Sequence, residues 1–431
     1  MTTREMTNIR IHWTLNILLS TILLWINIFC THAEERNSPN LKSDSVFLSY
    51  LQECGIKTTA HNEIKILKSG HDKFIDLFNE IEKAKHHIHL EYFNFRNDSI
   101  ANLLFEKLEK KVEQGVEVRA IFDAFGNSSN NQPLKKDHLK ALREKGIQIV
   151  EFDPLRFPWI NHVFHRDHRK IVVIDGIVGY TGGMNIADYY ITGLPEIGDW
   201  RDMHVRIKGD AVNDLQDIFL DMWERCTKEE INGSAYYPYR NGYKPVESQD
   251  EEVAIVDRYP RKSPKVMRRA YAKAIESAQE KVQIINPYFT PTRIIKKAIK
   301  KAIKKGVKVE IMIPGKSDIP FTPDAAFYIA NKLRKKGADI YIYNGGFHHS
   351  KIMMIDSLYC TVGSTNLNSR SLRYDYEVNA FIFDTETTDE LMTIFKEDQL
   401  DSTLLTSEIY KKKTPWKKFL GWFAHLFTPF L

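Results

Sequence analysis

The chain has 431 residues, of which 43% are hydrophobic and 27% charged, so it can form a packed core and is expected to fold as two or three domains. Its formal net charge of +5 is too small to indicate a nucleic-acid-binding protein. Four cysteines without a Cys-x-x-Cys pair exclude a disulfide framework and a cysteine zinc cluster.

The N-terminus contains a candidate targeting segment. Residues 13–30 form an uncharged, largely apolar run that follows Arg4 and Arg10. Basic residues before such a run keep its N-terminus in the cytoplasm and direct the following chain outward. The run is intermediate in length between the apolar part of a signal peptide and a full membrane-spanning helix. Residues 1–33 are therefore predicted to be a signal peptide or a membrane anchor, with lipidation at Cys30 as a third possibility, and the catalytic part is expected on the outer, periplasmic or extracellular side.

Residues 34–66 are expected to be a linker, followed by two similar halves at 67–240 and 251–410. Each half is predicted to contain helix, strand, helix and strand, at 74–85, 86–93, 100–114 and 116–122, and again at 265–278, 282–288, 292–305 and 307–313. A hairpin then follows; in the first half, strands at 171–174 and 177–181 flank an Asp-Gly turn. Helices that alternate with β-branched strands predict an α/β fold, here two similar α/β/α sandwich halves.

The internal repeat is the clearest signal in the sequence. A motif of the form His-x-Lys-x4-Asp occurs twice, a small-small-x-Asn string follows each copy, and all matched positions share one constant offset. The matched residues are His168, Lys170, Asp175 and Asn185 in the first half and His349, Lys351, Asp356 and Asn366 in the second. Upstream strings match at two slightly larger offsets, of which the first pairs Val118 with Val309 and the second pairs Tyr92 with Tyr288.

The motif residues suit phosphodiester chemistry. On a strand, residues i and i+2 face the same side, so each histidine projects together with its lysine. Two half-sites that face each other would supply one imidazole to attack phosphorus and another to protonate the leaving oxygen. Two lysines can neutralise the phosphate oxygens, and Asn185 and Asn366 can donate hydrogen bonds to them.

Each histidine also needs a partner that fixes its tautomer, usually a carboxylate. Asp202 is the candidate within the half of His168, and Glu377 is the candidate within the half of His349. Asp175 and Asp356, the last residues of the two motifs, fall at hairpin turns, where the local pattern indicates that they cap the turn.

Two other histidine groups leave a metal site open as an alternative, although the sequence predicts no metal. His162, His165 and His168 are spaced three apart, and His86, His87 and His89 form a cluster. The first group spans a loop that enters a strand and has no acidic neighbour that recurs in the second half. His87 and His89 alternate with apolar residues, which fits one wall of a sheet.

The paired motifs resemble those of the phospholipase D superfamily, and the chain is most similar to bacterial cardiolipin synthases from about residue 70 to its end. The strings that carry the resemblance are residues 167–176, 181–186, 200–205, 286–291 and 363–371. The resemblance implies one active site between two similar halves, with both complete motifs in it. It also implies transfer of a phosphatidyl group between two phosphatidylglycerol molecules through a phosphohistidine, without a metal or other cofactor. The charged approach to His168, together with the family's tendency to use the first motif, favours His168 as nucleophile and His349 as general acid and base.

The C-terminal residues 411–431 combine five lysines with apolar and aromatic residues and have no acid. This composition predicts an amphipathic tail that contacts a membrane surface with anionic lipids; a helix docked on the core is the alternative. Residues 34–410 have 54 basic and 55 acidic residues, which argues against nucleic acid as a partner. The expected activity is that of a cardiolipin synthase, for which a monomer suffices; a phospholipase D that uses water, or less favourably a nuclease, remains open.

Overall fold

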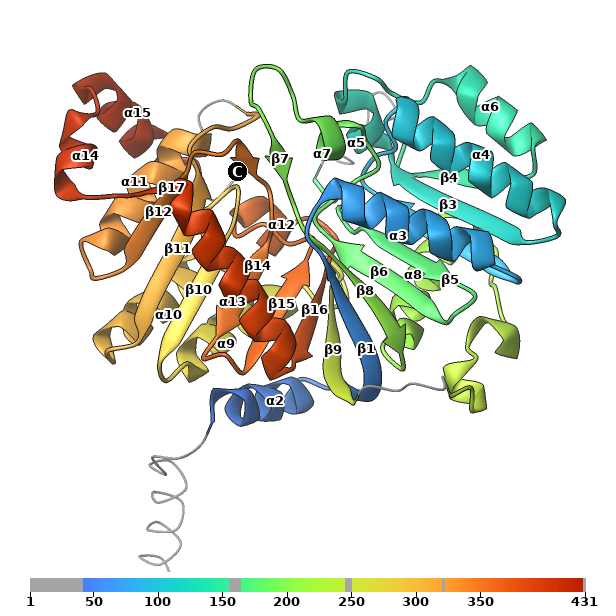
Figure 1. Ribbon diagram of the computed structural model, residues 1–431, viewed down its shortest axis with the longest axis horizontal. Helices are drawn as coiled ribbons and strands as arrows, with labels where there is room; N and C mark the ends of the chain where they lie inside the picture. Colours follow the sequence, from blue (N-terminus) through green and yellow to red (C-terminus); the bar gives the residue numbers. More distant parts are fainter. Residues whose placement is uncertain (1–41, 155–163, 245–249, 320–321, 429–431) are drawn as a thin grey trace, which may run out of the picture.

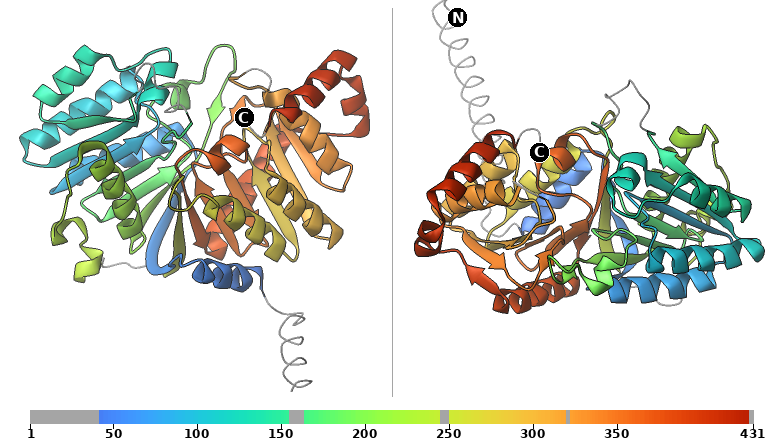
Figure 2. Two further views of the ribbon diagram at one scale, coloured as in Figure 1. Left: turned by 180° about the vertical axis from the view of Figure 1, so that it is seen from behind. Right: turned by 90° about the horizontal axis from the view of Figure 1, so that it is seen from above.

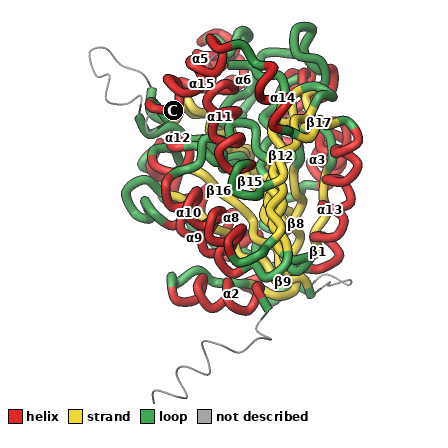
Figure 3. The backbone as a smooth tube through the Cα atoms, turned by 90° about the vertical axis from the view of Figure 1, so that its left-hand side faces the viewer, coloured by secondary structure: helices red, strands yellow, loops and turns green. Residues whose placement is uncertain are grey.

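A computed structural model describes residues 42–154, 164–244, 250–319 and 322–428. The predicted signal or anchor segment, residues 1–33, lies outside these described residues. The described strands form one 15-stranded sheet and a separate two-stranded pair. Helices α3 (Gly70–Lys83) and α13 (Thr385–Leu400) lie on one side of the large sheet, and helices α8 (Val212–Thr227), α9 (Val266–Ser277) and α10 (Arg293–Lys304) lie on the other (Figures 1 and 3).

The first half begins with β1 and ends with α8, followed by two short 3-10 turns. Its elements are β1 (Thr59–Leu67), α3 (Gly70–Lys83), β2 (His87–Tyr92), α4 (Ser99–Glu113), β3 (Glu117–Asp123), α5 (Ala124–Ser129), α6 (Lys136–Glu144), β4 (Gln148–Phe152), β5 (Ile171–Ile174), β6 (Val178–Gly182), α7 (Tyr189–Thr192), β7 (Trp200–Arg201), β8 (His204–Gly209), α8 (Val212–Thr227), η2 (Ser234–Tyr236) and η3 (Tyr239–Asn241).

The second half repeats this order and adds a C-terminal extension. Its elements are β9 (Glu251–Arg258), α9 (Val266–Ser277), β10 (Lys281–Ile285), α10 (Arg293–Lys304), β11 (Lys308–Pro314), α11 (Thr322–Arg334), β12 (Asp339–Tyr343), β13 (Phe347–His348), β14 (Ile352–Ile355), β15 (Tyr359–Gly363), α12 (Ser369–Arg373), β16 (Glu377–Phe383), α13 (Thr385–Leu400), β17 (Ser402–Leu404), α14 (Ser407–Lys412) and α15 (Pro415–Leu426).

The two halves are joined at the centre of the sheet. From this centre outward, the first half runs β1-β8-β6-β5-β2-β3-β4 and the second runs β9-β16-β15-β14-β10-β11-β12, so equivalent strands occupy equivalent places. The central strands β1 and β9 pair in antiparallel fashion, with Asn62 opposite Glu251. Both halves are therefore continuous in one layer (Figure 2). The predicted fold class, two similar α/β halves, is confirmed.

The strand register corrects one of the expected offsets. Ile88 lies opposite Ile174, and Val282 lies opposite the equivalent Ile355, so Ile88 corresponds to Val282 and not to Ile284. By the same register, Tyr288 is equivalent to Asn94 and not to Tyr92. The next strands correspond as expected, because Ile88 pairs with Val118 and Val282 with Val309.

The prediction of a linker at 34–66 is wrong for its described part. Residues 43–53 form helix α2, in which Phe47 and Leu51 are fully buried against the second half. The ring of Phe47 stacks on that of Tyr359, with ring centroids 5.3 Å apart. Strand β1 then enters the centre of the sheet. These residues fold because their apolar side chains fill the second half's core and β1 completes hydrogen bonding to β8 and β9.

The C-terminal extension ends in a helix, α15, that packs on the second half. Helix α15 lies against α11, on the outside of the molecule (Figure 1). The contact runs through its small residues Gly421 and Ala424, which are buried. A Cβ on Gly421 would come within 2.7 Å of the Asp324 carbonyl oxygen, so the close approach of the helices requires glycine here. Within the described residues, no helix is both long and apolar enough to cross a membrane.

Candidate active site

The two motif histidines lie just outside the strands that were expected to contain them. Strand β5 begins at Ile171 and β14 at Ile352, so His168 and His349 each precede a strand by a short segment. The sheet partner β2 pairs with β5 only as far as Glu91 opposite Ile171. Beyond that point the chain bonds to the other half: the His168 N–H donates to the Tyr376 carbonyl oxygen at 3.1 Å, and the His349 N–H to that of Arg201 at 2.7 Å.

This crossing of segments determines which carboxylate reaches which histidine. Glu377 follows Tyr376, and its Oε1 lies 3.1 Å from Nδ1 of His168. Asp202 follows Arg201, and its Oδ2 lies 2.7 Å from Nδ1 of His349. The expected pairing within each half is therefore wrong: each histidine is oriented by the carboxylate of the other half. Both acids are fully buried, and Glu377 also accepts a hydrogen bond from the Ser364 hydroxyl at 2.5 Å.

Burial lowers the pKa of both imidazoles, which favours their neutral forms. Removal from water, together with the charge of Lys170, lowers the pKa of His168 to about 4, although Glu377 acts in the opposite direction. Burial and the neighbouring Lys351 and Lys170 hold the pKa of His349 well below its ordinary value. Above pH 4, Nε2 of His168 therefore has a free lone pair when Nδ1–H donates to Glu377.

The two lysines lie beside their histidines, as the motif spacing predicts. Lys170 Nζ donates to the His168 carbonyl oxygen at 2.6 Å, and Lys351 Nζ lies 2.9 Å from Nδ1 of His349. Burial lowers the pKa of Lys170 to about 7, with Glu377 opposing it, and that of Lys351 to about 8, with Asp202 opposing it. An anionic phosphate between them would restore their usual charge, so the pair forms a site suited to a phosphodiester.

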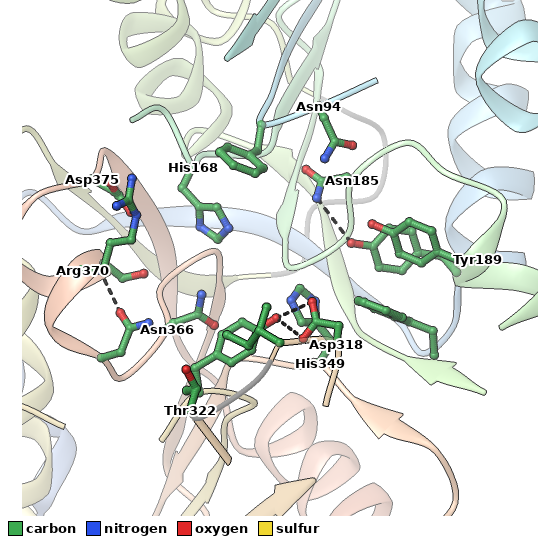
Figure 4. A pocket seen from close by; sticks show the side chains of 17 residues that line it. Asn94, His168, Asn185, Tyr189, Asp318, Thr322, His349, Asn366, Arg370 and Asp375 are labelled. Carbon is green, nitrogen blue, oxygen red and sulfur yellow. Dashed lines mark hydrogen bonds and ion pairs between the residues drawn. The ribbon is translucent and has the colours of Figure 1, made fainter. Parts of the chain in front are cut away.

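A pocket of about 420 Å³ opens onto this centre (Figure 4). His168, His349, Asn185 and Asn366 all line it. The Nδ2 of Asn185 contacts the Tyr190 hydroxyl at 3.5 Å. The Oδ1 atoms of both asparagines are buried and make no hydrogen bond within the described part of the chain. The structure thus brings both predicted asparagines to the same cavity as the histidines.

Asp175 and Asp356, the acids that complete the motifs, are at the far ends of β5 and β14 and do not line the pocket. The Asp356 carboxylate accepts hydrogen bonds from the backbone N–H groups of Gln279, Glu280 and Lys281 at 2.7 to 2.9 Å. Asp175 binds the amides of residues 85–87 in the same way. Both acids are therefore structural, as their turn positions indicate, and their place in a catalytic set is corrected.

Several residues that line the pocket are not among the site residues that the sequence predicts. They are Phe93, Asn94, Tyr189, Tyr190, Trp200, Tyr288, Asp318, Thr322 and Arg370. Lys73 does not line the pocket but supports it: this residue is fully buried and donates to the carbonyl oxygens of Met184 and Asn185 at 3.4 and 3.0 Å. In the observed register of β2 and β10, Tyr288 is equivalent to Asn94, and both residues line the pocket. That register shows that the two half-sites differ at this position, with an aromatic side chain in one and an amide in the other.

The other histidine groups do not form a candidate metal centre among the described residues, where no group of three or more His, Cys, Asp or Glu is suitably placed. His162 lies outside the described residues. His165 Nδ1 contacts the Tyr374 carbonyl oxygen at 2.8 Å. His87 and His89 are bridged by Gln216, at 3.2 and 2.9 Å, in a buried hydrogen-bond network on the sheet.

Comparison with known proteins gives the family of the site. The family model described as "Cardiolipin synthase, PLD-like domain" matches residues 77–223 and 271–399, which include both motifs. Cardiolipin synthase of Oceanobacillus iheyensis is 35% identical over 399 residues, covering 92% of this chain and 81% of that protein. Cardiolipin synthase 2 of Staphylococcus epidermidis is 38% identical over 376 residues, covering 86% and 75%.

The chain belongs to the cardiolipin synthase family of the phospholipase D superfamily. It is an enzyme, a phosphatidyltransferase associated with membranes. The fold is shared more widely: the crystal structure of phosphatidylserine synthase from Haemophilus influenzae matches with a TM-score of 0.67 at 16% identity, covering 90% of this chain and all of that one. Membership in this family explains why the motif occurs twice and why the histidines of both copies line one pocket.

Proposed function

We propose that this enzyme joins two molecules of phosphatidylglycerol into cardiolipin and releases glycerol, with a phosphatidyl group carried on His168. The observation that carries this proposal is the pair of carboxylate-bonded imidazoles that line one pocket with two lysines beside them. The membership in the cardiolipin synthase family supports the lipid substrate.

In the first step, the Nε2 lone pair of His168 attacks the phosphorus of the donor lipid. The N–P bond forms, the bond from phosphorus to the glycerol oxygen breaks, and that oxygen takes a proton from Nε2 of His349. His349 enters the cycle protonated, because the bound anionic phosphodiester and the Asp202 carboxylate together favour its charged form. The developing positive charge on His168 is stabilised by Glu377, and that on protonated His349 by Asp202. Lys170 and Lys351 neutralise the non-bridging oxygens, with Asn185 and Asn366 as hydrogen-bond donors.

In the second step, the headgroup of another phosphatidylglycerol enters where glycerol left. Neutral His349 accepts the proton of its primary hydroxyl, the new O–P bond forms, and the N–P bond to His168 breaks. The product is cardiolipin, and His349 is again protonated for the next cycle. If water takes the place of the hydroxyl, phosphatidic acid results, which is the hydrolase alternative.

Purified enzyme in phosphatidylglycerol vesicles tests the reaction. Cardiolipin and glycerol in equal amounts support the transferase; phosphatidic acid alone favours hydrolysis. His168→Ala and His349→Ala should each lower turnover by roughly 10³-fold or more, and near-normal activity in either variant would contradict the shared site.

EDTA should leave the rate of transfer unchanged, because lysines neutralise the phosphate. A loss of activity that added metal restores would contradict this assignment.

The position of the intermediate is tested separately. Enzyme quenched during turnover of phosphatidyl-labelled lipid should carry an acid-labile label on the peptide that contains His168. Label only on the His349 peptide would reverse the two histidine roles and leave the reaction class unchanged.

We also propose that residues 411–431 contact the membrane through α15. The exposed side chains of this helix are mostly apolar: Trp416, Phe419, Trp422, Phe423, Leu426 and, just beyond it, Phe427. Lys411, Lys412, Lys417 and Lys418 lie beside them in sequence and favour anionic lipid. Because α15 packs on α11, whose residue Thr322 lines the pocket, membrane contact here would fix the pocket relative to the bilayer. From Arg4 and Arg10, which precede the apolar residues 13–30, we place the catalytic part on the outer side of the membrane, with a monomer sufficient and no nucleic acid involved.

A further inference from the structure

The two ends of the active-site pocket differ in chemistry. On the His168 side, Arg370 lines the wall, and its Nε lies 3.1 Å from Asp375 Oδ2. On the His349 side, the wall has an acidic side chain, Asp318, close to that histidine (Figure 4). A carboxylate in a pocket for an anionic lipid repels the phosphate, so its presence needs a role other than phosphate binding.

Asp318 is held in a defined position by an aromatic neighbour. The Tyr288 hydroxyl donates to both Oδ1 and Oδ2 of Asp318, at 2.7 and 2.8 Å. The Tyr288 ring in turn meets the His349 ring edge-on, with centroids 5.9 Å apart. The Trp200 ring contacts the same imidazole, with centroids 5.4 Å apart. The carboxylate is therefore placed relative to His349 by a single intervening side chain.

We infer that Asp318 is a specificity-determining residue that accepts a hydrogen bond from the second free hydroxyl of a glycerol headgroup. The inference rests on the proposed function, in which glycerol leaves, and the acceptor headgroup enters, on the His349 side of the phosphorus. The primary hydroxyl of that headgroup loses its proton to His349, forms the new O–P bond and displaces His168. The neighbouring hydroxyl keeps its proton and donates it in a hydrogen bond to Asp318.

The charge balance favours a neutral hydroxyl over a cationic headgroup. Burial raises the pKa of Asp318, whereas the Tyr288 hydroxyl, which donates to its carboxylate, and the charge of Lys351 act in the opposite direction. A carboxylate offers about four acceptor sites, so sites are left for a further donor. Water, ethanol or 1-propanol have no second hydroxyl to use them, which gives a reason for a polyol acceptor to be preferred.

Internal competition between soluble alcohols tests this inference. Purified full-length enzyme in phosphatidylglycerol micelles receives equal concentrations of deuterated glycerol and deuterated 1-propanol. Mass spectrometry then gives the ratio of headgroup-labelled phosphatidylglycerol to phosphatidylpropanol, which equals the ratio of the two kcat/KM values. The wild type should favour glycerol, and Asp318→Ala should lower the ratio by about tenfold or more while transfer to 1-propanol continues. Replacement of glycerol by 1,2-propanediol should preserve the preference, and 1,3-propanediol should lose it.

Two further variants make the result specific. Tyr288→Phe keeps the aromatic ring but removes the hydroxyl that positions the Asp318 carboxylate. The ratio of glycerol to 1-propanol transfer should therefore fall less than in Asp318→Ala, where the carboxylate itself is lost. Asp389→Asn neutralises an exposed carboxylate on α13 and should leave the ratio at the wild-type value.

The contrary outcomes are distinct. An unchanged ratio in Asp318→Ala, an equal loss of transfer to both alcohols, or a wild-type preference for ethanolamine over glycerol overturns the hydroxyl subsite and leaves the transferase reaction intact. Transfer to water alone, with no alcohol product, overturns the proposed function and the subsite with it.

Discussion

Glu377 of the second half lies 3.1 Å from Nδ1 of His168 in the first half, and Asp202 of the first half lies 2.7 Å from Nδ1 of His349 in the second. Neither half therefore contains a complete histidine–carboxylate pair. The exchange follows from the backbone: residues 167–168 and 376 are bonded side by side, and strand β13, which ends at His348, pairs with β7, which precedes Asp202. The active site exists only when the halves are joined.

The crossed pairs predict which step each carboxylate affects. Glu377→Gln should lower the rate of phosphatidyl transfer to His168, because the amide does not favour the tautomer with a free Nε2; the expected loss is roughly 10²- to 10⁴-fold. Asp202→Asn should impair protonation of the leaving group by His349 instead. Phosphatidyl-p-nitrophenol separates the two effects, since nitrophenolate leaves without a proton.

With that substrate, stopped-flow absorbance should show a rapid burst of nitrophenolate in Asp202→Asn and no burst in Glu377→Gln. The reverse result, a burst in Glu377→Gln alone, would support pairing within each half and contradict the crossed arrangement.

The pH dependence should favour mildly acidic conditions. His168 must be neutral to attack, and its pKa is lowered to about 4, so this requirement is met above that value. Lys170 and Lys351, with pKa values lowered to about 7 and about 8, lose their charge as pH rises through that range. Protonation of His349 also becomes less favourable as pH rises. We expect kcat/KM to be highest between about pH 4 and pH 7.

Initial rates across this range at constant ionic strength measure the profile. Lys351→Arg keeps its charge at high pH, so its decline above about pH 7 should be shallower even if its maximum is lower. A kcat/KM that continues to rise above the pKa values of both lysines in the wild type would contradict their assignment to phosphate neutralisation.

The motif acid Asp356 should affect stability more than chemistry. Its carboxylate accepts three backbone hydrogen bonds and its φ is +53°, a region that asparagine tolerates better than alanine. Asp356→Ala should lower the free energy of unfolding by about 2 to 4 kcal/mol, and Asp356→Asn by less. Urea unfolding followed by circular dichroism gives both values. Loss of all activity in a fully folded Asp356→Asn protein would instead show a direct catalytic role.

The sequence predicts the repeat well because each motif copy is local. The constant offset identifies His168, Lys170 and Asn185 with their counterparts, and the pattern of strands and helices identifies the α/β halves. The match of residues 88–93 to the second half is displaced by two residues. A shift of two residues along a strand leaves the same set of side chains facing the core, so the apolar pattern looks equally good in both registers. Pattern alone therefore cannot distinguish Tyr92 from Asn94 as the equivalent of Tyr288.

The crossed carboxylates could not be predicted for a different reason. The pairing depends on which segments of the two halves lie next to each other, and sequence distance favours the nearer acid. Similarly, residues 43–67 have no partner within their own stretch of sequence. Helix α2 is stabilised by the core of the second half, and β1 is stabilised by the strands on both of its sides. The folding of these two elements therefore depends on tertiary contacts that the local sequence does not show.

Membrane binding by α15 should depend on its exposed rings. The side chain of Trp416 is 67% exposed, so Trp416→Ser should leave the fold unchanged while removing apolar area that would enter a bilayer. The double variant with Phe419→Ser should lower the partition of the enzyme onto phosphatidylglycerol vesicles by about tenfold or more. Binding of the wild type should weaken with added salt and with neutral lipid, because the neighbouring lysines are attracted to anionic headgroups.

The matched control is Ile294→Ser, which alters an exposed apolar side chain on α10, another helix rich in lysine. Vesicle co-sedimentation of the wild type, the double variant and Ile294→Ser compares them directly. Equal losses in both variants would mean that the lysine-rich surface binds without a specific contribution from α15, and no loss in the double variant would assign α15 to packing on α11 alone.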